Sequence, residues 1–175
     1  MEAVIAWDAA GLALLHSVRA GWLDSVFLAL TWLGSLAVLL PPALLLWWSR
    51  RGERSAAFVA LALVGASALG HLAKLITARP RPDRFPPLIA MPEDWSFPSA
   101  HAVQVTAFAL AWMLRPGTAP GRIEIVALLA VAALVGVSRL YLQVHFPSDV
   151  IAGVMIATFW VVFLRRLPAW RENAK

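Results

Sequence analysis

The chain has 175 residues, of which 61% are hydrophobic and only 14% charged, and its mean hydropathy is +0.73. A soluble domain carries about 25% charged residues, so this composition excludes an ordinary soluble domain and indicates several membrane crossings. Cysteine is absent, which excludes disulfides and thiolate chemistry. The net charge of +5 comes from basic residues in short loops between apolar segments, which membrane topology explains better than nucleic-acid binding does.

Residues 1–21 are predicted to form an amphipathic helix lying in the membrane interface, with a sixth membrane-spanning helix as the alternative. Their apolar residues are interrupted by polar ones, so no long apolar run develops. The apolar residues are Val4, Trp7, Leu14, Leu15 and Val18, and the interrupting residues are Asp8, His16 and Arg19. Glu2 and Asp8, without a basic segment, argue against a cleavable signal peptide.

Five apolar stretches follow, and we expect each to cross the membrane: Leu23–Trp48, Ser55–Thr77, Ser99–Leu114, Arg122–Leu142 and Asp149–Leu164. The first is too long for a straight span, and Pro41-Pro42 are expected to kink or break it. Ser99–Leu114 gives a helix of roughly 24 Å, short of the ~30 Å hydrocarbon core, so we expect it to extend beyond these limits.

The predicted fold is an all-α, polytopic membrane helical bundle of five transmembrane helices plus the N-terminal interfacial helix. We expect a single membrane-embedded domain over residues 1–175. It would comprise the interfacial helix at 1–21, the helical bundle at 22–167 and a cytoplasmic tail at 168–175.

Basic residues in the loops predict the orientation of the bundle. Nine lie on one side, namely Arg50, Arg51, Arg54, Arg115, Arg122, Arg165, Arg166, Arg171 and Lys175. Six lie on the other, namely Arg19, Lys74, Arg79, Arg81, Arg84 and Arg139, and three of these are assigned to chemistry below. The positive-inside rule therefore places the side with nine in the cytoplasm.

A histidine and a carboxylate four residues apart form the first candidate site. On a helix, His145 and Asp149 would share one face, and a carboxylate beside an imidazole fixes its tautomer and stabilises its positive charge. Arg139 precedes a short turn and offers a planar fork suited to phosphate oxygens. The structural alternative is a capped helix start with an interfacial His and Asp.

A second cluster opens the short apolar stretch. Pro98 precedes a helix start whose free N–H groups suit an anion, and the Ser99 hydroxyl and the Ala100 N–H can contribute to it. His101 is placed to protonate a leaving oxygen as a general acid. Ordinary helix capping with one interfacial histidine is the alternative.

A third cluster supplies positive charge. Lys74 lies near the end of a span, where an ionisable residue indicates function. Arg81 follows between Pro80 and Pro82, which cannot continue the helix. A lysine that reaches the interface beside a solvated basic loop is the alternative. His71, one turn before Lys74, either lines the approach to the pocket or is an ordinary buried or interfacial histidine.

All three clusters fall at span ends on the predicted outer side, and together they resemble a known signature. Lys74-x6-Arg81-Pro82, Pro98-Ser99-Ala100-His101 and Ser138-Arg139-x5-His145-x3-Asp149 look like the three motifs of the type 2 phosphatidic acid phosphatase superfamily. The chain departs from that pattern at Ala100, where the family has Gly. The family's spacing selects Arg81 over Arg79.

The resemblance implies a role for each residue. His145 would attack phosphorus and form a phosphohistidine, Asp149 would orient it, and His101 would protonate the leaving group and then activate water. The phosphate oxygens would be bound by Lys74, Arg81, Ser99, the Ala100 N–H and Arg139. No metal or other cofactor is expected, because these cations stabilise the transferring group.

The resemblance further implies a metal-independent hydrolase in the bilayer whose substrate is a membrane lipid phosphate or diphosphate. The short chain and the N-terminal helix resemble bacterial undecaprenyl diphosphate phosphatases, in a bacterial inner membrane with the site facing the periplasm or cell exterior. Phosphatases for phosphatidylglycerol phosphate, phosphatidic acid or lipid A remain open, as does a lipid phosphotransferase. A non-catalytic lipid transporter or scaffold is the alternative from another class.

Overall fold

A computed structural model describes residues 2–49 and 54–170, and these residues form helices joined by turns and loops. The α-helices are α1 (Glu2–Ser17), α2 (Gly21–Leu30), α3 (Leu36–Ser49), α4 (Arg54–Thr77), α5 (Ala100–Leu114), α6 (Arg122–Tyr141) and α7 (Pro147–Arg166). Two short 3₁₀ helices, η1 (Thr31–Gly34) and η2 (Pro168–Trp170), complete the described part of the chain.

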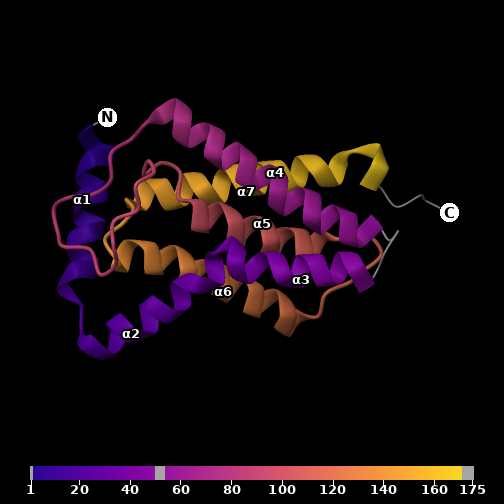
Figure 1. Cartoon of the computed structure of the whole chain (residues 1–175), viewed down its shortest axis with the longest axis horizontal. Coiled ribbons are helices and arrows are strands. Elements are labelled where there is room, and N and C mark those ends of the chain that lie inside the picture. The colour runs from indigo at the N-terminus through magenta and orange to yellow at the C-terminus, as the bar shows by residue number, and fades with distance from the viewer. Residues whose placement is uncertain (1, 50–53, 171–175) are drawn as a thin grey trace.

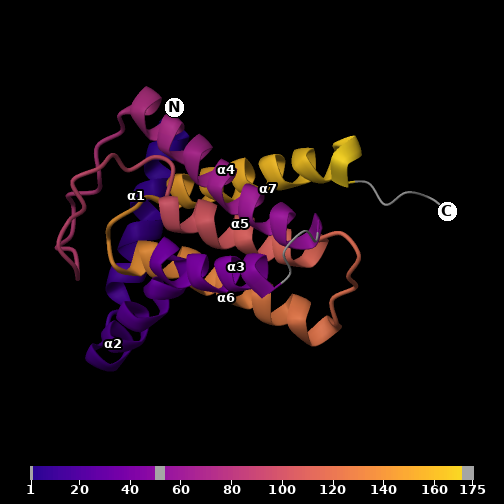
Figure 2. The ribbon, with the colours of Figure 1, turned by 45° about the vertical axis from the view of Figure 1, so that its right-hand side comes forward.

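Helices α3 to α7 run roughly along the long axis of the molecule, and α1 lies across one end of them (Figure 1). A long loop, residues 78–99, folds over the same end, beside α1 (Figure 2). Helix α5 packs against α4, α6 and α7 and therefore lies at the centre of the bundle. The end that carries α1 and the long loop is called the α1 end below.

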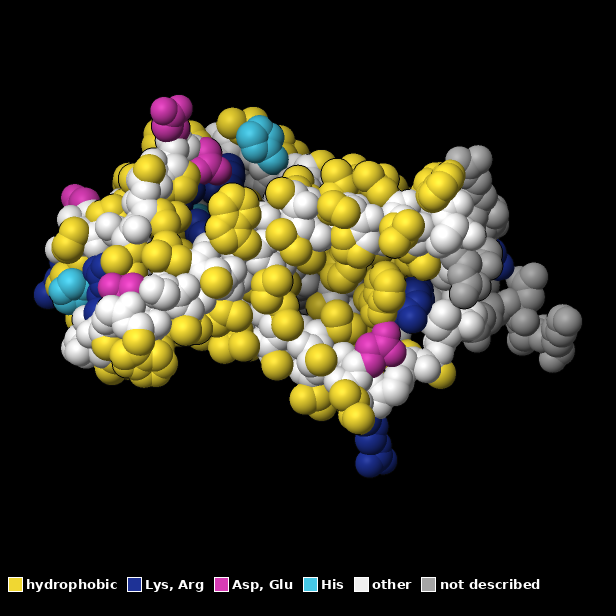
Figure 3. All heavy atoms as spheres, turned by 60° about the horizontal axis from the view of Figure 1, so that its bottom comes forward, with side chains coloured by type: hydrophobic (Ala, Val, Ile, Leu, Met, Phe, Trp, Pro, Cys, Tyr) yellow, Lys and Arg dark blue, Asp and Glu magenta, His cyan; other side chains and the backbone are white. Residues whose placement is uncertain are grey.

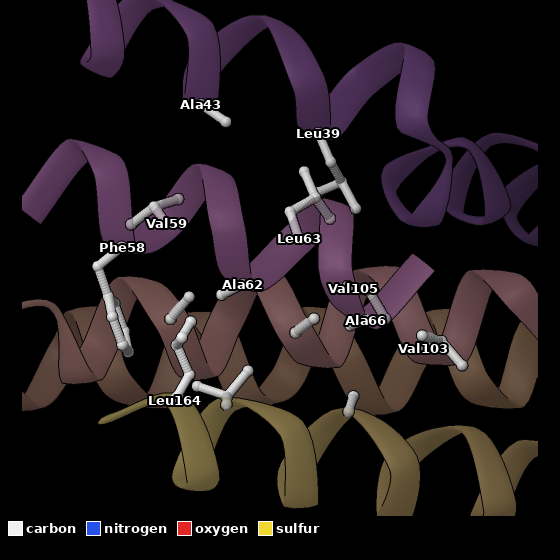
Figure 4. Packing of buried hydrophobic residues seen from close by; sticks show 14 of the residues in the cluster. Leu39, Ala43, Phe58, Val59, Ala62, Leu63, Ala66, Val103, Val105 and Leu164 are labelled. Carbon is white, nitrogen blue, oxygen red and sulfur yellow. The ribbon is translucent and has the colours of Figure 1, made fainter. Parts of the chain in front are cut away.

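The core is built from small and branched side chains between these helices. In Figure 4, Leu63 of α4 lies beside Leu39 of α3, and Ala66 of α4 lies beside Val105 of α5, all within one cluster of buried residues. Alanines at several contacts let the helix backbones approach closely, as is usual where helices pack in a membrane.

The surface has the character expected of a membrane protein. Hydrophobic side chains cover the sides of the bundle in Figure 3, and charged side chains gather toward its two ends. Among the described residues, α4, α6 and α7 are long and apolar enough to cross a bilayer. The pair formed by Gly21–Gly34 and Leu36–Ser49 is apolar enough only when taken together, and its bend of 41° fits either one broken span or a re-entrant loop. The predicted all-helical membrane bundle is therefore confirmed, and the exact number of five spans remains a prediction.

The expectation that Pro41-Pro42 break the first span is wrong, whereas a kink at these prolines stays a prediction. The first span breaks at Ser35, not at the prolines, and α3 continues through Pro41 and Pro42. Buried Leu39 and Ala43 flank the prolines, so core packing holds the helix across them, as membrane helices commonly allow.

Helix α5 also does not extend beyond the apolar stretch. It begins after Pro98 and the extended Ser99 and ends at Leu114, because Arg115 precedes Pro116 and takes an extended conformation. Its length of about 22 Å is acceptable at the centre of the bundle, where neighbouring helices cover it.

Helix α1 differs from a simple amphipathic helix. Val4, Ile5, Trp7 and Leu14 are all at least 48% exposed, whereas Asp8 is buried at 1%. Apolar side chains therefore face outward, as suits contact with lipid. Asp8, one of the polar residues that interrupt the apolar run, is buried against the bundle.

Candidate active site

The three sequence clusters meet at the α1 end of the bundle. Lys74 lies in the last turn of α4, His101 in the first turn of α5 and Arg139 in the last turn of α6. Arg81 comes from the loop of residues 78–99, and His145 from the short turn before α7. This turn reverses the chain with Gln143 at a φ of 59°, a value in the left-handed region.

His145 is held on both sides of its ring. Nδ1 lies 3.5 Å from Asp149 Oδ2, and Nε2 lies 3.2 Å from Arg81 Nη1. His145 precedes α7, so the two residues do not share a helix face as predicted. The contact forms because Asp149, in the first turn of α7, reaches back and also accepts a hydrogen bond from Phe146 N at 2.9 Å. Asp149 therefore caps the helix and contacts the histidine at the same time.

Arg81 is fixed by the backbone around it. Its Nη1 donates to Val144 O at 2.7 Å and its Nε donates to Asp94 O at 2.8 Å. Arg79, the other arginine of the doubled Arg-Pro, binds Asp149 instead of approaching His145 Nε2. Arg81 is therefore the arginine of this pair that lies beside His145 Nε2, and its role in binding phosphate stays a prediction.

Asp94 links two of the three cations assigned to phosphate. Its Oδ2 lies 3.0 Å from Lys74 Nζ, and its Oδ1 accepts from Arg81 Nη2 at 2.5 Å. Lys74 Nζ also donates to Trp95 O. Lys74 is buried, whereas the Asp94 side chain is 49% exposed. The cations are therefore held together by a carboxylate that solvent reaches.

The remaining phosphate candidates line the inner side of the site. Arg139 is 3% exposed and donates from Nη1 to Thr31 Oγ1 of η1 at 2.6 Å, while its Nε is buried without a partner. Ser99 precedes α5, and its buried Oγ also has no partner among the described residues. Ala100 N begins the free N–H groups of α5, which suit an anion.

His101 lies close to η1 and within the field of the other site residues. The charges acting on it belong to Arg139, His145, Arg81 and Asp94. A Cβ built at Gly34 would lie 3.2 Å from the Cβ of His101, so the absence of a side chain at Gly34 allows η1 to cover this histidine closely.

His71 lines a cavity of about 260 Å³ that also borders Lys74, Asp94 and Ala100. It therefore takes the position expected of a residue at the approach to the pocket, and it is exposed rather than buried.

The pKa values of His145 and Asp94 are both lowered, which leaves the histidine able to act as a nucleophile and Asp94 ionised. Burial lowers the pKa of His145 to about 4, and the charges of Arg81 and Arg139 act in the same direction, against the hydrogen bond to Asp149. For Asp94, burial would raise the pKa, but the hydrogen bonds and charges of Lys74 and Arg81 outweigh it and hold the pKa below its usual value. At neutral pH, His145 is therefore neutral and Asp94 negative.

Four residues of the site were not identified from the sequence: Asp8, Arg79, Asp94 and Ser96. Ser96 donates from Oγ to Asp149 Oδ2 at 2.5 Å. Arg79 was considered only as the less suitable of two arginines, and Asp8 only as a polar residue of an interfacial helix. A buried carboxylate opposite an unassigned arginine is visible only once the chain is folded.

Among the described residues, no group of three or more His, Asp or Glu side chains is arranged to hold a metal ion. The expectation of metal-independent chemistry remains a prediction.

Comparison with known proteins identifies the family. The family model described as the PAP2 superfamily matches residues 55–173. The chain belongs to this superfamily, so the predicted family and the phosphatase class are confirmed.

Relatives of known activity come from several organisms. The chain is 33% identical over 146 residues to an undecaprenyl-diphosphatase of Sulfolobus acidocaldarius, covering 81% of this chain and 68% of the relative. It is 39% identical over 114 residues to a decaprenylphosphoryl-5-phosphoribose phosphatase of Mycobacterium tuberculosis, covering 63% of this chain and 59% of the relative. It is 30% identical over 145 residues to phosphatidylglycerophosphatase B of Bacillus subtilis, covering 78% and 70%. The chain thus spans about three fifths of the mycobacterial relative.

Solved structures share the fold. A transmembrane PAP2-type phosphatidylglycerolphosphate phosphatase from Bacillus subtilis superimposes with a TM-score of 0.87 at 24% identity, covering 100% of this chain and 90% of that one. LpxE of Aquifex aeolicus gives a TM-score of 0.77 at 25% identity, covering 89% and 93%. The protein is therefore a multi-pass membrane protein of this fold.

Proposed function

We propose that the protein hydrolyses a lipid-linked phosphate or diphosphate through a phosphohistidine on His145. One observation carries this proposal: the imidazole of His145 is held between the Asp149 carboxylate at Nδ1 and the Arg81 guanidinium at Nε2. With Nδ1–H facing Asp149, the lone pair of Nε2 points toward the cation that would hold phosphate.

The first step transfers phosphorus to the histidine. His145 Nε2 attacks, the new N–P bond forms, and the bond from phosphorus to the lipid oxygen breaks while His101 gives that oxygen a proton. Lys74, Arg81 and Arg139 stabilise the charge on the equatorial oxygens, with the Ser99 hydroxyl and the Ala100 N–H as further donors.

The second step returns the histidine to its starting form. His101, now neutral, takes a proton from water as that water attacks phosphorus and the N–P bond breaks. Inorganic phosphate leaves, His101 is protonated again and His145 recovers its lone pair. No metal enters either step.

We further propose a polyprenyl lipid as substrate, with undecaprenyl diphosphate converted to undecaprenyl phosphate plus inorganic phosphate as the first choice. The Sulfolobus relative supports a polyprenyl diphosphate, and the mycobacterial relative supports a phosphate on a polyprenyl-linked sugar. Phosphatidylglycerol phosphate is the second candidate, supported by the Bacillus subtilis relative. The test below also separates the remaining alternatives. These are phosphatidic acid or lipid A as substrate, a phosphotransferase reaction, and a non-catalytic transporter or scaffold. The proposed location is a bacterial inner membrane, with five spans and the site on the periplasmic or exterior side.

The test is phosphate release by purified protein against a panel of these lipids, with EDTA present. We expect release without any added acceptor, highest kcat/KM on a polyprenyl substrate, and loss of activity in His145→Ala. Arg81→Ala and Arg139→Ala should lose most activity while the helical content is unchanged. Retained turnover in His145→Ala would overturn the mechanism, a need for an acceptor would indicate a transferase, and loss in EDTA would indicate a metal.

A further inference from the structure

Arg79 forms a bridge between α1 and the start of α7. Its Nη1 donates to Asp149 Oδ1 and to Ser148 Oγ, both at 2.7 Å, and its Nη2 donates to Asp8 Oδ2 at 2.7 Å. Its Cζ lies 4.1 Å from the ring centroid of Phe146, so the guanidinium is also stacked on an aromatic face. The two terminal nitrogens of the guanidinium make three hydrogen bonds, and a lysine ammonium could make only some of these contacts.

Asp8 is the far end of this bridge. It is buried at 1%, and besides Arg79 it accepts from Ser148 N at 2.8 Å and from Ser148 Oγ at 2.6 Å. A buried carboxylate persists only when it is paired and hydrogen-bonded. The carboxylate of Asp8 lies against the first turn of α7, where the free N–H groups of the helix favour a negative charge. Asp8 therefore binds both the arginine and the backbone of α7.

The two oxygens of Asp149 have different partners. Oδ1 takes the hydrogen bond from Arg79, while Oδ2 takes those from Ser96 and from Phe146 N and faces His145. With one oxygen fixed by Arg79, rotation of the carboxylate about its last bond is blocked. The other oxygen is then held opposite the imidazole.

The charges in the bridge alternate. If Arg79 had no second partner, its full positive charge would act on Asp149 and weaken the ability of that carboxylate to stabilise a positively charged imidazole. Asp8 lies on the other side of the guanidinium and balances it. Arg79 therefore fixes the orientation of the Asp149 carboxylate, and Asp8 prevents the arginine from cancelling the negative charge that Asp149 presents to His145.

From this geometry we propose that Asp8 and Arg79 act together as a clamp that positions Asp149 against His145. The inference rests on the proposed role of His145 as nucleophile. Both are positioning residues, since neither touches the reacting atoms, and α1 becomes part of the catalytic apparatus instead of a membrane anchor alone.

The packing of α1 supports a close, fixed contact. A Cβ at Gly11 would lie 2.6 Å from Pro147 Cγ, so α1 approaches the start of α7 more closely than any residue with a side chain would allow. The next residue of α1, Leu12, also contacts this region: Gln143, two residues before His145, donates from Nε2 to Leu12 O at 3.1 Å. Contacts on both sides of the turn that carries His145 therefore hold α1 in register.

The experiment measures kcat and KM separately for Asp8→Asn, Arg79→Gln, Arg79→Lys and the double variant Asp8→Asn/Arg79→Gln. Misplacement of a reacting group lowers the rate by up to about 100-fold, so we expect kcat to fall about 10- to 100-fold in the single variants. KM should change less than about threefold, because the clamp does not bind phosphate. The double variant should be no slower than the worse single variant, because both act through one carboxylate. Arg79→Lys should recover part of the loss.

The controls are chosen by position. Glu2→Gln changes an exposed acid of α1, and Arg84→Gln changes an exposed arginine of the same loop, and both should keep wild-type kcat. Far-UV circular dichroism and gel filtration in detergent establish folding, and the milder Asp8→Asn decides the question if Arg79→Gln does not fold.

The possible outcomes are distinct. Wild-type kcat in Asp8→Asn, a rise in KM alone, or additive losses in the double variant would overturn the clamp. His145→Ala is measured alongside: if it is inactive while the clamp variants are normal, only the clamp fails. If His145→Ala is active, the proposed function itself fails.

Discussion

Asp94 places a negative charge between two cations that a phosphate group must contact. The phosphate has to displace the carboxylate from Lys74 and Arg81 or share them with it. The Asp94 side chain is 49% exposed, so it can move away into solvent at little cost, and its ion pairs are worth less than buried ones. Asp94 is therefore expected to weaken phosphate binding without preventing it.

Replacement of Asp94 tests this competition. Asp94→Asn keeps the shape and removes the charge, so we expect inorganic phosphate to inhibit at a concentration about two- to fivefold lower, because ion pairs to a half-exposed carboxylate are weak. The measurement is inhibition of lipid hydrolysis by phosphate, with exposed Asp83→Asn from the same loop as control. Weaker inhibition in Asp94→Asn would mean that the carboxylate holds the cations in place for phosphate.

The protonation of His145 gives a second prediction at the residue scale. Its pKa is lowered to about 4, so the imidazole is neutral above that pH and gains a proton only as the pH falls through about 4. We expect its ¹⁵N ring shifts in detergent to stay constant from pH 8 to pH 5. His145→Gln identifies the signal, and a titration centred near 6.5 would contradict the burial of this side chain.

At the scale of elements, hydrophobic length predicted the helices well and their ends less well. Long apolar runs gave α4, α6 and α7, because about 20 apolar residues have one stable form in a bilayer. Proline was a poor guide to the break in the first span, since packing on both sides of Pro41-Pro42 outweighs the lost hydrogen bonds. The short loops around His145 also could not be placed by helical periodicity, because His145 lies outside α7.

The contact between α1 and α7 can be tested by a single methyl group. Gly11→Ala would force Pro147 and α1 apart, because the new Cβ would lie 2.6 Å from Pro147 Cγ. We expect overpacking to cost about 1–3 kcal/mol of stability and the shift to lower kcat about tenfold. The matched control is Gly21→Ala at the start of α2, where a Cβ would meet nothing within 4 Å. Thermal unfolding and kcat, measured on both variants, check the prediction, and equal behaviour would contradict it.

For the whole molecule, the sequence indicated which residues gather but not how they are supported. Lys74, His101, Arg139 and His145 could be placed together because span ends on one side of a membrane must share a surface. The role of Asp8 could not be found in this way, since it is 141 positions from Asp149 and only the tertiary fold joins them through Arg79. Its burial was also hidden, because an acid in an interfacial helix normally faces water.

The positions of the basic residues relative to the site define a topology that can be measured in cells. Arg115 and Arg122 lie at the end of the bundle opposite the site, and the positive-inside rule places that end in the cytoplasm. The chain has no cysteine, so single cysteines report without background. Ala119→Cys, in the loop between α5 and α6, and Ala90→Cys, in the loop over the site, are matched and both exposed. In intact cells, an impermeant thiol reagent should label Ala90→Cys and leave Ala119→Cys unmodified until the membrane is opened. The reverse pattern would place the site in the cytoplasm, and the substrate would then have to be presented on the inner leaflet.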